Sequence, residues 1–164
     1  MKNFIFKYYG FLGLALGGMS LWLISQYGGD NQIELYGAVA AGTLGFFYFI
    51  QQQKLAETQL FYNLFIMFNS RYDNLNEKLS SIVKCPAEEL TTDHQNTLID
   101  YFNLCAEEYL FYKEGYIHPD AWRSWCRGMR WYLSHKHIRD IWDKEIKTNS
   151  YYGLSLPVIE KGAT

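Results

Sequence analysis

Basic and aromatic residues alternate in one segment near the end of the chain. Arg123, Arg127 and Arg130 follow the i, i+4 and i+7 spacing that places side chains on one face of a helix. From Arg123 to Arg139 there are five positive charges and no acid. Guanidinium groups pair with phosphates and aromatic rings stack on bases, so the segment predicts a nucleotide-binding surface. The candidate ligand-binding residues are Arg123, Arg127, Arg130, Trp131, His135, Lys136, His137 and Arg139, with Arg71 from an earlier helix.

The same arginines also have a structural interpretation. The preceding segment carries acids that can pair with arginine across an antiparallel helix contact. Some arginines can brace this acidic segment while others bind a ligand, so both interpretations stay open. The acids are Asp100, Glu107, Glu108 and Glu114.

Arg130 and His135 have the Arg-x4-His spacing of a helical ribonuclease family that cleaves RNA with an arginine and histidine pair. Trp131 stands where that family usually has a polar side chain. A membrane-tethered ribonuclease is therefore the third of three functional hypotheses.

Beyond this spacing, the sequence shows neither a metal-binding pattern nor a familiar catalytic motif. His135 and His137 have no cysteine or acid pair at ligand spacing beside them, so no metal is expected. The chain has no glycine-rich phosphate loop, no nucleophile elbow and no His-Glu-x-x-His motif. We therefore expect a protein that is not an enzyme and needs no cofactor.

Two charge-free runs stand near the start of the chain, at residues 8–29 and 35–53. Each is long enough to cross a hydrocarbon core of roughly 30 Å as a helix. A signal peptide is the alternative for the first run, but no clean small-x-small cleavage site follows it and a second run comes at once. The sequence predicts a transmembrane hairpin over residues 1–53.

Flanking charges and aromatic residues predict how this hairpin is oriented. Lys2 and Lys7 precede the first run and Lys54 follows the second, whereas the loop carries only Asp30 and Glu34. The positive-inside rule therefore places both termini in the cytoplasm. Aromatic residues near the expected membrane interfaces include Phe4, Phe6, Tyr8, Tyr9, Trp22, Tyr27 and Tyr36.

Residues 54–164 are expected to form one helical cytoplasmic domain. From Phe46 to Cys85 there is no glycine or proline, so one long helix is predicted. Its apolar stripe packs either on later helices of its own domain or on another subunit. Small residues four apart in the two runs favour either assembly or packing within one hairpin. The stripe is Phe61, Phe65, Phe68, Tyr72, Leu75, Leu79 and Ile82, and the small pairs are Gly13 and Gly17, Ala38 and Gly42, and Ala41 and Gly45.

Helix signals recur after Pro86 and no strand alternation is convincing, so the predicted fold class is all-α. Helices are expected to start near residues 91–93 and at Pro119, with Gly115 ending the first, and a last helix carries Ile138 and Trp142. The tail over residues 148–164 is predicted as coil, and His94 as a surface residue. Three scattered, free cysteines suit a reducing compartment: Cys85, Cys105 and Cys126.

The segments FNSRYDNLN (68–76) and LIDYFNLCAEEYLFYKEGYIHPDAWRSW (98–125) resemble a bacterial domain family of unknown function that follows one or two membrane helices. In length, in its two spans and in its compact helical domain the chain is similar to the small membrane effector of type III CRISPR systems that senses cyclic tetra-adenylate. That resemblance implies a tetramer in the bacterial inner membrane, cyclic oligoadenylate binding and membrane perturbation that halts phage replication. It carries over no ligand contact.

The leading hypothesis is thus a membrane-anchored antiviral effector that binds a cyclic oligonucleotide. The second is a membrane-tethered helical scaffold that binds another protein and no nucleotide. The net charge of −2 gives no argument for a polyanionic partner, and no duplex nucleic acid is expected.

Overall fold

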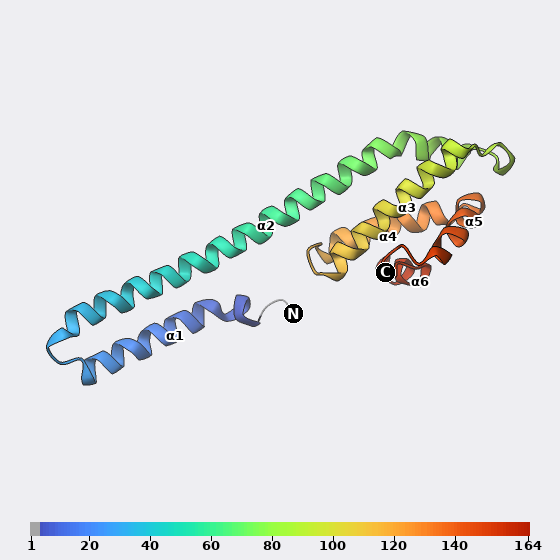
Figure 1. The fold of residues 1–164 in the computed structure, drawn as a ribbon. Coiled ribbons are helices and arrows are strands. Elements are labelled where there is room, and N and C mark those ends of the chain that lie inside the picture. Colours follow the sequence, from blue (N-terminus) through green and yellow to red (C-terminus); the bar gives the residue numbers. More distant parts are fainter. Residues whose placement is uncertain (1–3) are drawn as a thin grey trace. The chain divides into compact units, whose positions relative to one another are not determined.

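The computed structural model describes the backbone of residues 4–164 and the side chains from Tyr8 onward. Within this part of the chain every regular element is a helix, which confirms the all-α fold class (Figure 1). Contacts divide the chain into a hairpin unit, Met1–Gln59, and a helical unit, Leu60–Thr164. Helix α2 contributes residues to both units.

Two antiparallel helices form the hairpin unit. Helix α1 (Phe4–Tyr27) leads through the short η1 turn (Gly29–Asn31) into α2 (Gln32–Lys84). A Cβ on Gly13 would lie 2.9 Å from the ring of Phe47, so glycine allows the two helices to approach closely here. The ammonium nitrogen of Lys54 lies 4.1 Å from the ring centre of Tyr9, so Lys54 and the start of α1 share one end of the hairpin.

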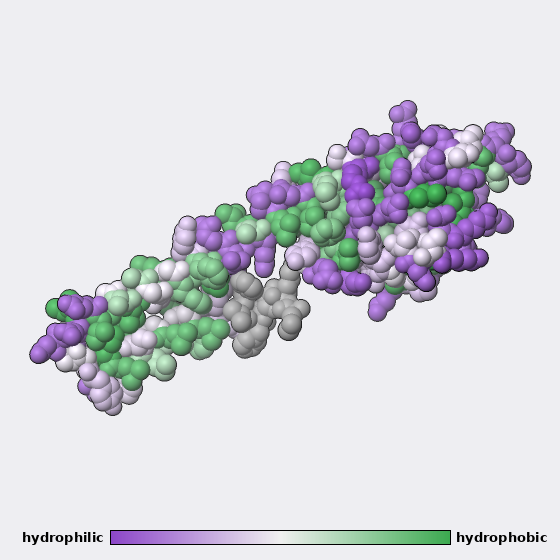
Figure 2. Space-filling view, viewed as in Figure 1, coloured by the Kyte–Doolittle hydropathy of each residue, from purple (hydrophilic) through white to green (hydrophobic). Residues whose placement is uncertain are grey.

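Both helices are long and apolar enough to cross a membrane. The segments that qualify are Tyr8–Tyr27, with mean hydropathy 1.3, and Gly29–Lys84, with mean hydropathy 1.5 over its most apolar window. Only 6% of each window is buried within the chain, whereas a core helix of a soluble protein would be mostly buried. In the view of Figure 2, hydrophobic and pale residues predominate along the coloured part of the hairpin, and hydrophilic residues gather at the turn between α1 and α2.

The orientation of the hairpin stays a prediction. It depends partly on Lys2 and Lys7, and the aromatic belt partly on Phe4 and Phe6, and these side chains lie outside the described residues.

The two sets of small residues in the hairpin unit differ in surroundings. Gly13 and Gly17 face α2, where Thr43 lies 3.1 Å from a Cβ built on Gly17. Gly42 and Gly45 are exposed and have open space in place of a Cβ. The α1 pair therefore packs the hairpin, while the exposed small face of α2 is left for other contacts.

Four further helices complete the helical unit (Figure 1). They are α3 (Thr92–Lys113), α4 (Pro119–Leu133), α5 (Lys136–Glu145) and α6 (Leu156–Gly162), with short turns η2 (Ala87–Glu89) and η3 (Ile146–Thr148). Helices α3 and α4 pack on the last part of α2, α5 is hydrogen-bonded to its end, and α6 packs on α4.

Local sequence explains where these helices begin and end. Thr91 caps α3 by accepting a hydrogen bond from the backbone N–H of His94 at 3.2 Å. The N–H of Thr91 donates to Nδ1 of His94 at 3.3 Å, so His94 completes a capping box, a role that the sequence did not reveal. Gly115 has a φ of 81° just after α3, a conformation that glycine adopts at little cost. Pro119 opens α4, as predicted.

Part of the apolar stripe of α2 is buried within its own unit, while Phe65 is still 38% exposed, so contact of the stripe with another subunit stays a prediction. Phe68, Leu79 and Ile82 are fully buried. Phe65 stacks on Trp125 of α4 with ring centres 6.0 Å apart. This core is continuous with Phe102 and Trp142, whose rings meet edge to face at 5.0 Å.

The prediction that residues 148–164 are coil is wrong. Helix α6 forms within this tail and packs against α4. Leu154, Ile159 and Ala163 are buried, and Pro157 lies in the first turn, where a missing N–H costs no hydrogen bond. Seven residues are too few to show a helical period in the sequence, so the prediction missed this helix.

Substitution of Gly162 tests the packing of α6 on α4. A Cβ there would lie 2.5 Å from the Cys126 sulfur and 2.8 Å from Trp122 Nε1, so we expect Gly162→Ala to destabilise the unit by about 1–3 kcal/mol. The matched control is Gly128→Ala within α4, where open space predicts stabilisation of about 1 kcal/mol. Thermal unfolding of the full chain in detergent measures both. Equal melting temperatures for the two variants would contradict this packing.

Candidate functional site

The three arginines of α4 lie on its exposed side but differ in their contacts. Arg123 pairs with Asp120 one turn earlier, with 2.8 Å between nitrogen and oxygen. Arg127 donates from Nε to the backbone carbonyl of Ala163 at 3.3 Å. Arg130 is exposed and makes no side-chain hydrogen bond or ion pair with any described residue. Arg130 is thus the most available cation of the three.

The cations of α5 are paired within their own helix. Lys136 lies 2.8 Å from Asp140, and Arg139 lies 2.8 Å from Asp143, each at the i, i+4 spacing. Such exposed pairs are weak and exchange readily with solvent.

In the described chain, the acids of α3 do not pair with the arginines of α4. The prediction that these arginines pair with the preceding acidic helix is therefore wrong. Acids within the same helix replace them for Arg123 and Arg139. An acid one turn away in a helix is always within reach, whereas a pair between helices requires the two side chains to face each other.

Trp131 follows Arg127 by four residues, a spacing that places both on one side of α4. Trp131 is 53% exposed, and its ring centre lies 5.0 Å from that of His135. The Nδ1 atom of His135 lies 3.1 Å from the carbonyl oxygen of Trp131 and 3.2 Å from that of Tyr132. Donation to these carbonyls requires the hydrogen on Nδ1, which leaves Nε2 as an acceptor in the neutral ring.

His137 has a structural role. Its Nε2 donates to the carbonyl oxygen of Ile82 at 3.0 Å. Ile82 is in the last turn of α2, and its carbonyl oxygen also accepts a hydrogen bond from the N–H of Cys85 at 3.1 Å. The side chain therefore caps the end of α2 with a bond between two helices.

These contacts divide the predicted binding residues. Four have no acid partner among the described residues and lie on α4 or at the start of α5, and we name them the α4 face: Arg127, Arg130, Trp131 and His135. Arg123, Lys136, Arg139 and His137 are held by neighbours. Arg130 and His135, the pair with ribonuclease spacing, both belong to the face, and their catalytic role stays a prediction.

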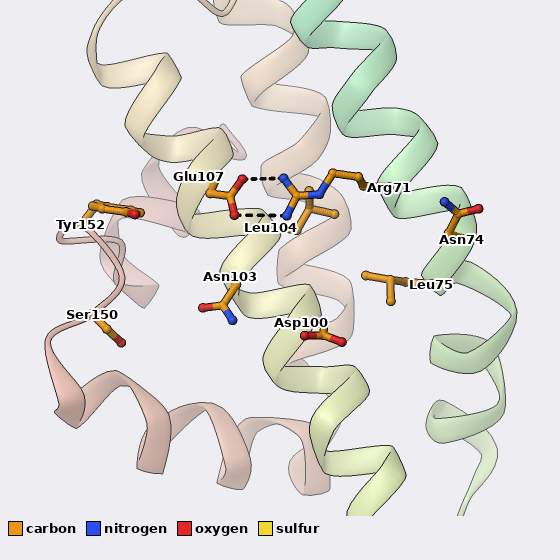
Figure 3. Close-up of a pocket in the computed structure, with 9 residues that line it drawn as sticks. All are labelled: Arg71, Asn74, Leu75, Asp100, Asn103, Leu104, Glu107, Ser150 and Tyr152. Atoms are coloured by element: carbon orange, nitrogen blue, oxygen red, sulfur yellow. Dashed lines mark hydrogen bonds and ion pairs between the residues drawn. The ribbon is translucent and has the colours of Figure 1, made fainter.

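Arg71 lies apart from this face, at a polar pocket of about 420 Å³ (Figure 3). Its guanidinium group makes two hydrogen bonds to the carboxylate of Glu107 across α2 and α3, one of them 3.1 Å long. The two side chains are 41% and 35% exposed, so solvent screens the pair and its contribution to stability is small.

The polar pocket is poorly suited to a polyanion. Arg71 is already matched by Glu107, and Asp100 adds a second acid to the lining. The remaining polar side chains, Asn74, Asn103 and Ser150, are neutral. An oligonucleotide phosphate entering here would have to displace Glu107 from Arg71, so the α4 face is the better phosphate site.

Glu108 is a buried acid that the sequence analysis did not predict. It is only 6% exposed and lines a second pocket of about 210 Å³. Burial raises the pKa of its carboxyl to about 8, and repulsion from Glu107 adds to this against the attraction of Arg71. A signal did exist, because Glu108 follows the buried Tyr101 and Leu104 at i+7 and i+4.

Comparison with protein families, curated proteins and solved structures finds no match to the chain. Both resemblances drawn from the sequence therefore stay predictions, and the function rests on the chemistry of the described residues.

The burial of Glu108 predicts how stability depends on pH. The native state holds a proton up to about pH 8 that the unfolded chain releases near pH 4.5, so stability is lost as pH rises between these values. We expect a loss of a few kcal/mol over this range, at about 1.4 kcal/mol per pKa unit. Glu108→Gln should remove this dependence in thermal unfolding of the full chain, whereas Glu114→Gln, at an exposed position, should keep it. Parallel curves for wild type and Glu108→Gln would contradict the buried, neutral carboxyl.

Proposed function

We propose that this protein is a membrane-anchored effector of bacterial antiviral defence. It assembles as a homo-oligomer, binds a cyclic oligoadenylate through its helical unit and perturbs the inner membrane. Cyclic tetra-adenylate and a tetramer are the specific ligand and assembly proposed. The observation that carries the proposal is the α4 face, where Arg127 and Arg130 have no acid partner and Trp131 is exposed beside them.

Several features of the chain support this function. A cyclic tetranucleotide presents four phosphates and four bases, and a symmetric tetramer would meet each repeat with the same arginine and aromatic group. Two apolar helices fit a membrane anchor. Helix α2 belongs to both units, so it is the segment through which ligand binding would act on the hairpin.

Reversal of the charge at Arg130 tests the binding surface. Arg130 has no side-chain partner among the described residues, so Arg130→Glu removes a phosphate contact without breaking an ion pair. We expect cyclic tetra-adenylate to bind at least about tenfold more weakly to the full chain in detergent. Calorimetric titration measures the affinity.

Two variants serve as comparisons for Arg130→Glu. Lys136→Glu makes the same charge change at a side chain that is 87% exposed and paired with Asp140, so affinity should change little. Arg127→Glu also breaks the bond to Ala163 and so lowers stability, which makes it a poorer test. Unchanged affinity in Arg130→Glu would remove the α4 face from the site, and a chain that binds no cyclic oligoadenylate would favour the scaffold hypothesis.

The exposed small face of α2 predicts where subunits meet. Gly42 has open space around it and is exposed beside Ala38 and Ala41, so a second helix can approach closely. Gly42→Leu should shift the protein toward monomers, measured by its mass in detergent. Gly18→Leu, on α1 with equal open space, should leave the assembly unchanged. The same mass for wild type and Gly42→Leu would exclude this face from the subunit contact.

A further inference from the structure

The second pocket of the helical unit is a site that the α4 face does not include. It has a volume of about 210 Å³ and is lined by residues from α2, α3 and α4. Ser124 and Gly128 of its lining are exposed and one helical turn apart, so the pocket opens to solvent along α4. The lining residues are Asn69, Tyr72, Tyr101, Glu108, Ser124, Trp125, Gly128 and Met129.

Glu108 is the only acidic residue in this lining, and no basic residue lines the pocket. Its carboxyl makes no hydrogen bond to any described residue. No fully enclosed side-chain nitrogen or oxygen of the described chain lacks a hydrogen-bond partner. The carboxyl oxygens of Glu108 are therefore reached through the pocket. A buried carboxyl without a hydrogen-bond partner costs folding free energy. A ligand in the pocket that supplies this partner would therefore bind favourably.

The groups around Glu108 keep its carboxyl neutral at neutral pH. Arg71 of α2 attracts its charge, but Arg71 is already bound to Glu107 of α3, whose charge repels it. The other titratable neighbours are Tyr101 and Cys105 of α3 and Cys126 of α4, and burial raises the pKa of all three. With a pKa of about 8, the Glu108 carboxyl offers one O–H donor beside one acceptor oxygen.

The complement of such a carboxyl is a planar group that carries an acceptor next to an N–H donor. The Watson–Crick edge of adenine, with ring nitrogen N1 beside the amino group, has this pattern. Aromatic residues of the lining suit a flat ring, and they are held in place by further contacts. Trp125 is stacked on Phe65, and the hydroxyl of Tyr72 lies 3.0 Å from that of Tyr132.

Pocket size limits what can enter. Pockets for drug-sized ligands are about 300–1,000 Å³, whereas this one is about 210 Å³. It suits one base with the sugar and phosphate left outside. The chain places Arg127 directly before Gly128, so an exposed arginine lies next to the opening.

We propose that the pocket binds a single nucleobase, whose acceptor and amino group pair with the carboxyl of Glu108 between the aromatic side chains of Tyr72 and Trp125. The choice of adenine among bases rests on the proposed function. The class of ligand, a planar ring with adjacent acceptor and donor, rests on the pocket alone.

Glu108→Gln and Glu108→Met form a matched pair for testing this site. Glutamine keeps a donor beside an acceptor but cannot ionise, whereas methionine removes both and leaves an apolar side chain of similar size. Adenosine and cyclic tetra-adenylate are titrated into the full chain in detergent from pH 6 to pH 9.5. Glu114→Gln, at the exposed residue that follows the end of α3, is the control.

We expect wild type to bind both probes below pH 8 and to lose affinity about tenfold per pH unit well above it, because the protonated carboxyl is the binding form. Glu108→Gln should bind without this pH dependence, and Glu108→Met should bind about 10- to 100-fold more weakly. Affinity that rises with pH and is lost in Glu108→Gln would overturn the proposal and indicate a pocket for an organic cation instead.

The two probes separate this site from the proposed function. Binding of cyclic tetra-adenylate that ignores both Glu108 variants would overturn the nucleobase pocket and leave the effector function standing. Adenosine binding that depends on Glu108, without binding of the cyclic ligand, would support the pocket and overturn the function. Failure of both probes to bind wild type would overturn both.

Discussion

Burial of three residues of the apolar stripe on α2 is the constraint around which the helical unit forms. Phe68, Leu79 and Ile82 are fully enclosed, and nothing on α2 itself can cover them. Helices α3 and α4 supply that cover through Phe111 and Trp125, whose ring centres both lie 5.7 Å from that of Phe68. His137 adds a hydrogen bond from α5 to the end of α2. Without this packing, neither the α4 face nor the pocket at Glu108 would exist.

The helical unit contains local ion pairs within α4 and α5, the pair of Arg71 with Glu107 between α2 and α3, and one buried acid. Arg123, Lys136 and Arg139 pair with acids three or four residues away, and water screens these pairs. Glu108 has no such partner and is held neutral by burial. Among the arginines of α4, Arg127 and Arg130 therefore lack an acid partner in the described chain, and Glu108 is a buried acid without a hydrogen bond to any described residue. A charged, flat ligand such as a nucleotide uses both kinds of group.

Periodicity and capping residues were enough to predict most of the fold. The absence of glycine and proline from Phe46 to Cys85 predicted the long helix, and Pro119 predicted the start of α4. Helix α6 was missed because it has only seven residues and depends on contact with α4. The sequence could not predict which arginines lack an acid partner, because ion pairing depends on the direction in which each side chain points. Glu108 shares the spacing of buried residues in α3, but its charge made a buried position look improbable.

The most direct test of a ligand-gated membrane effector is the release of a fluorescent dye from lipid vesicles that contain the full chain. The two apolar helices are long enough to span the vesicle bilayer, and ligand is supplied both outside and in the lumen. Cyclic tetra-adenylate should cause rapid release, and vesicles without protein should stay intact. Saturating ligand that binds the protein and leaves the dye enclosed would contradict the proposed function.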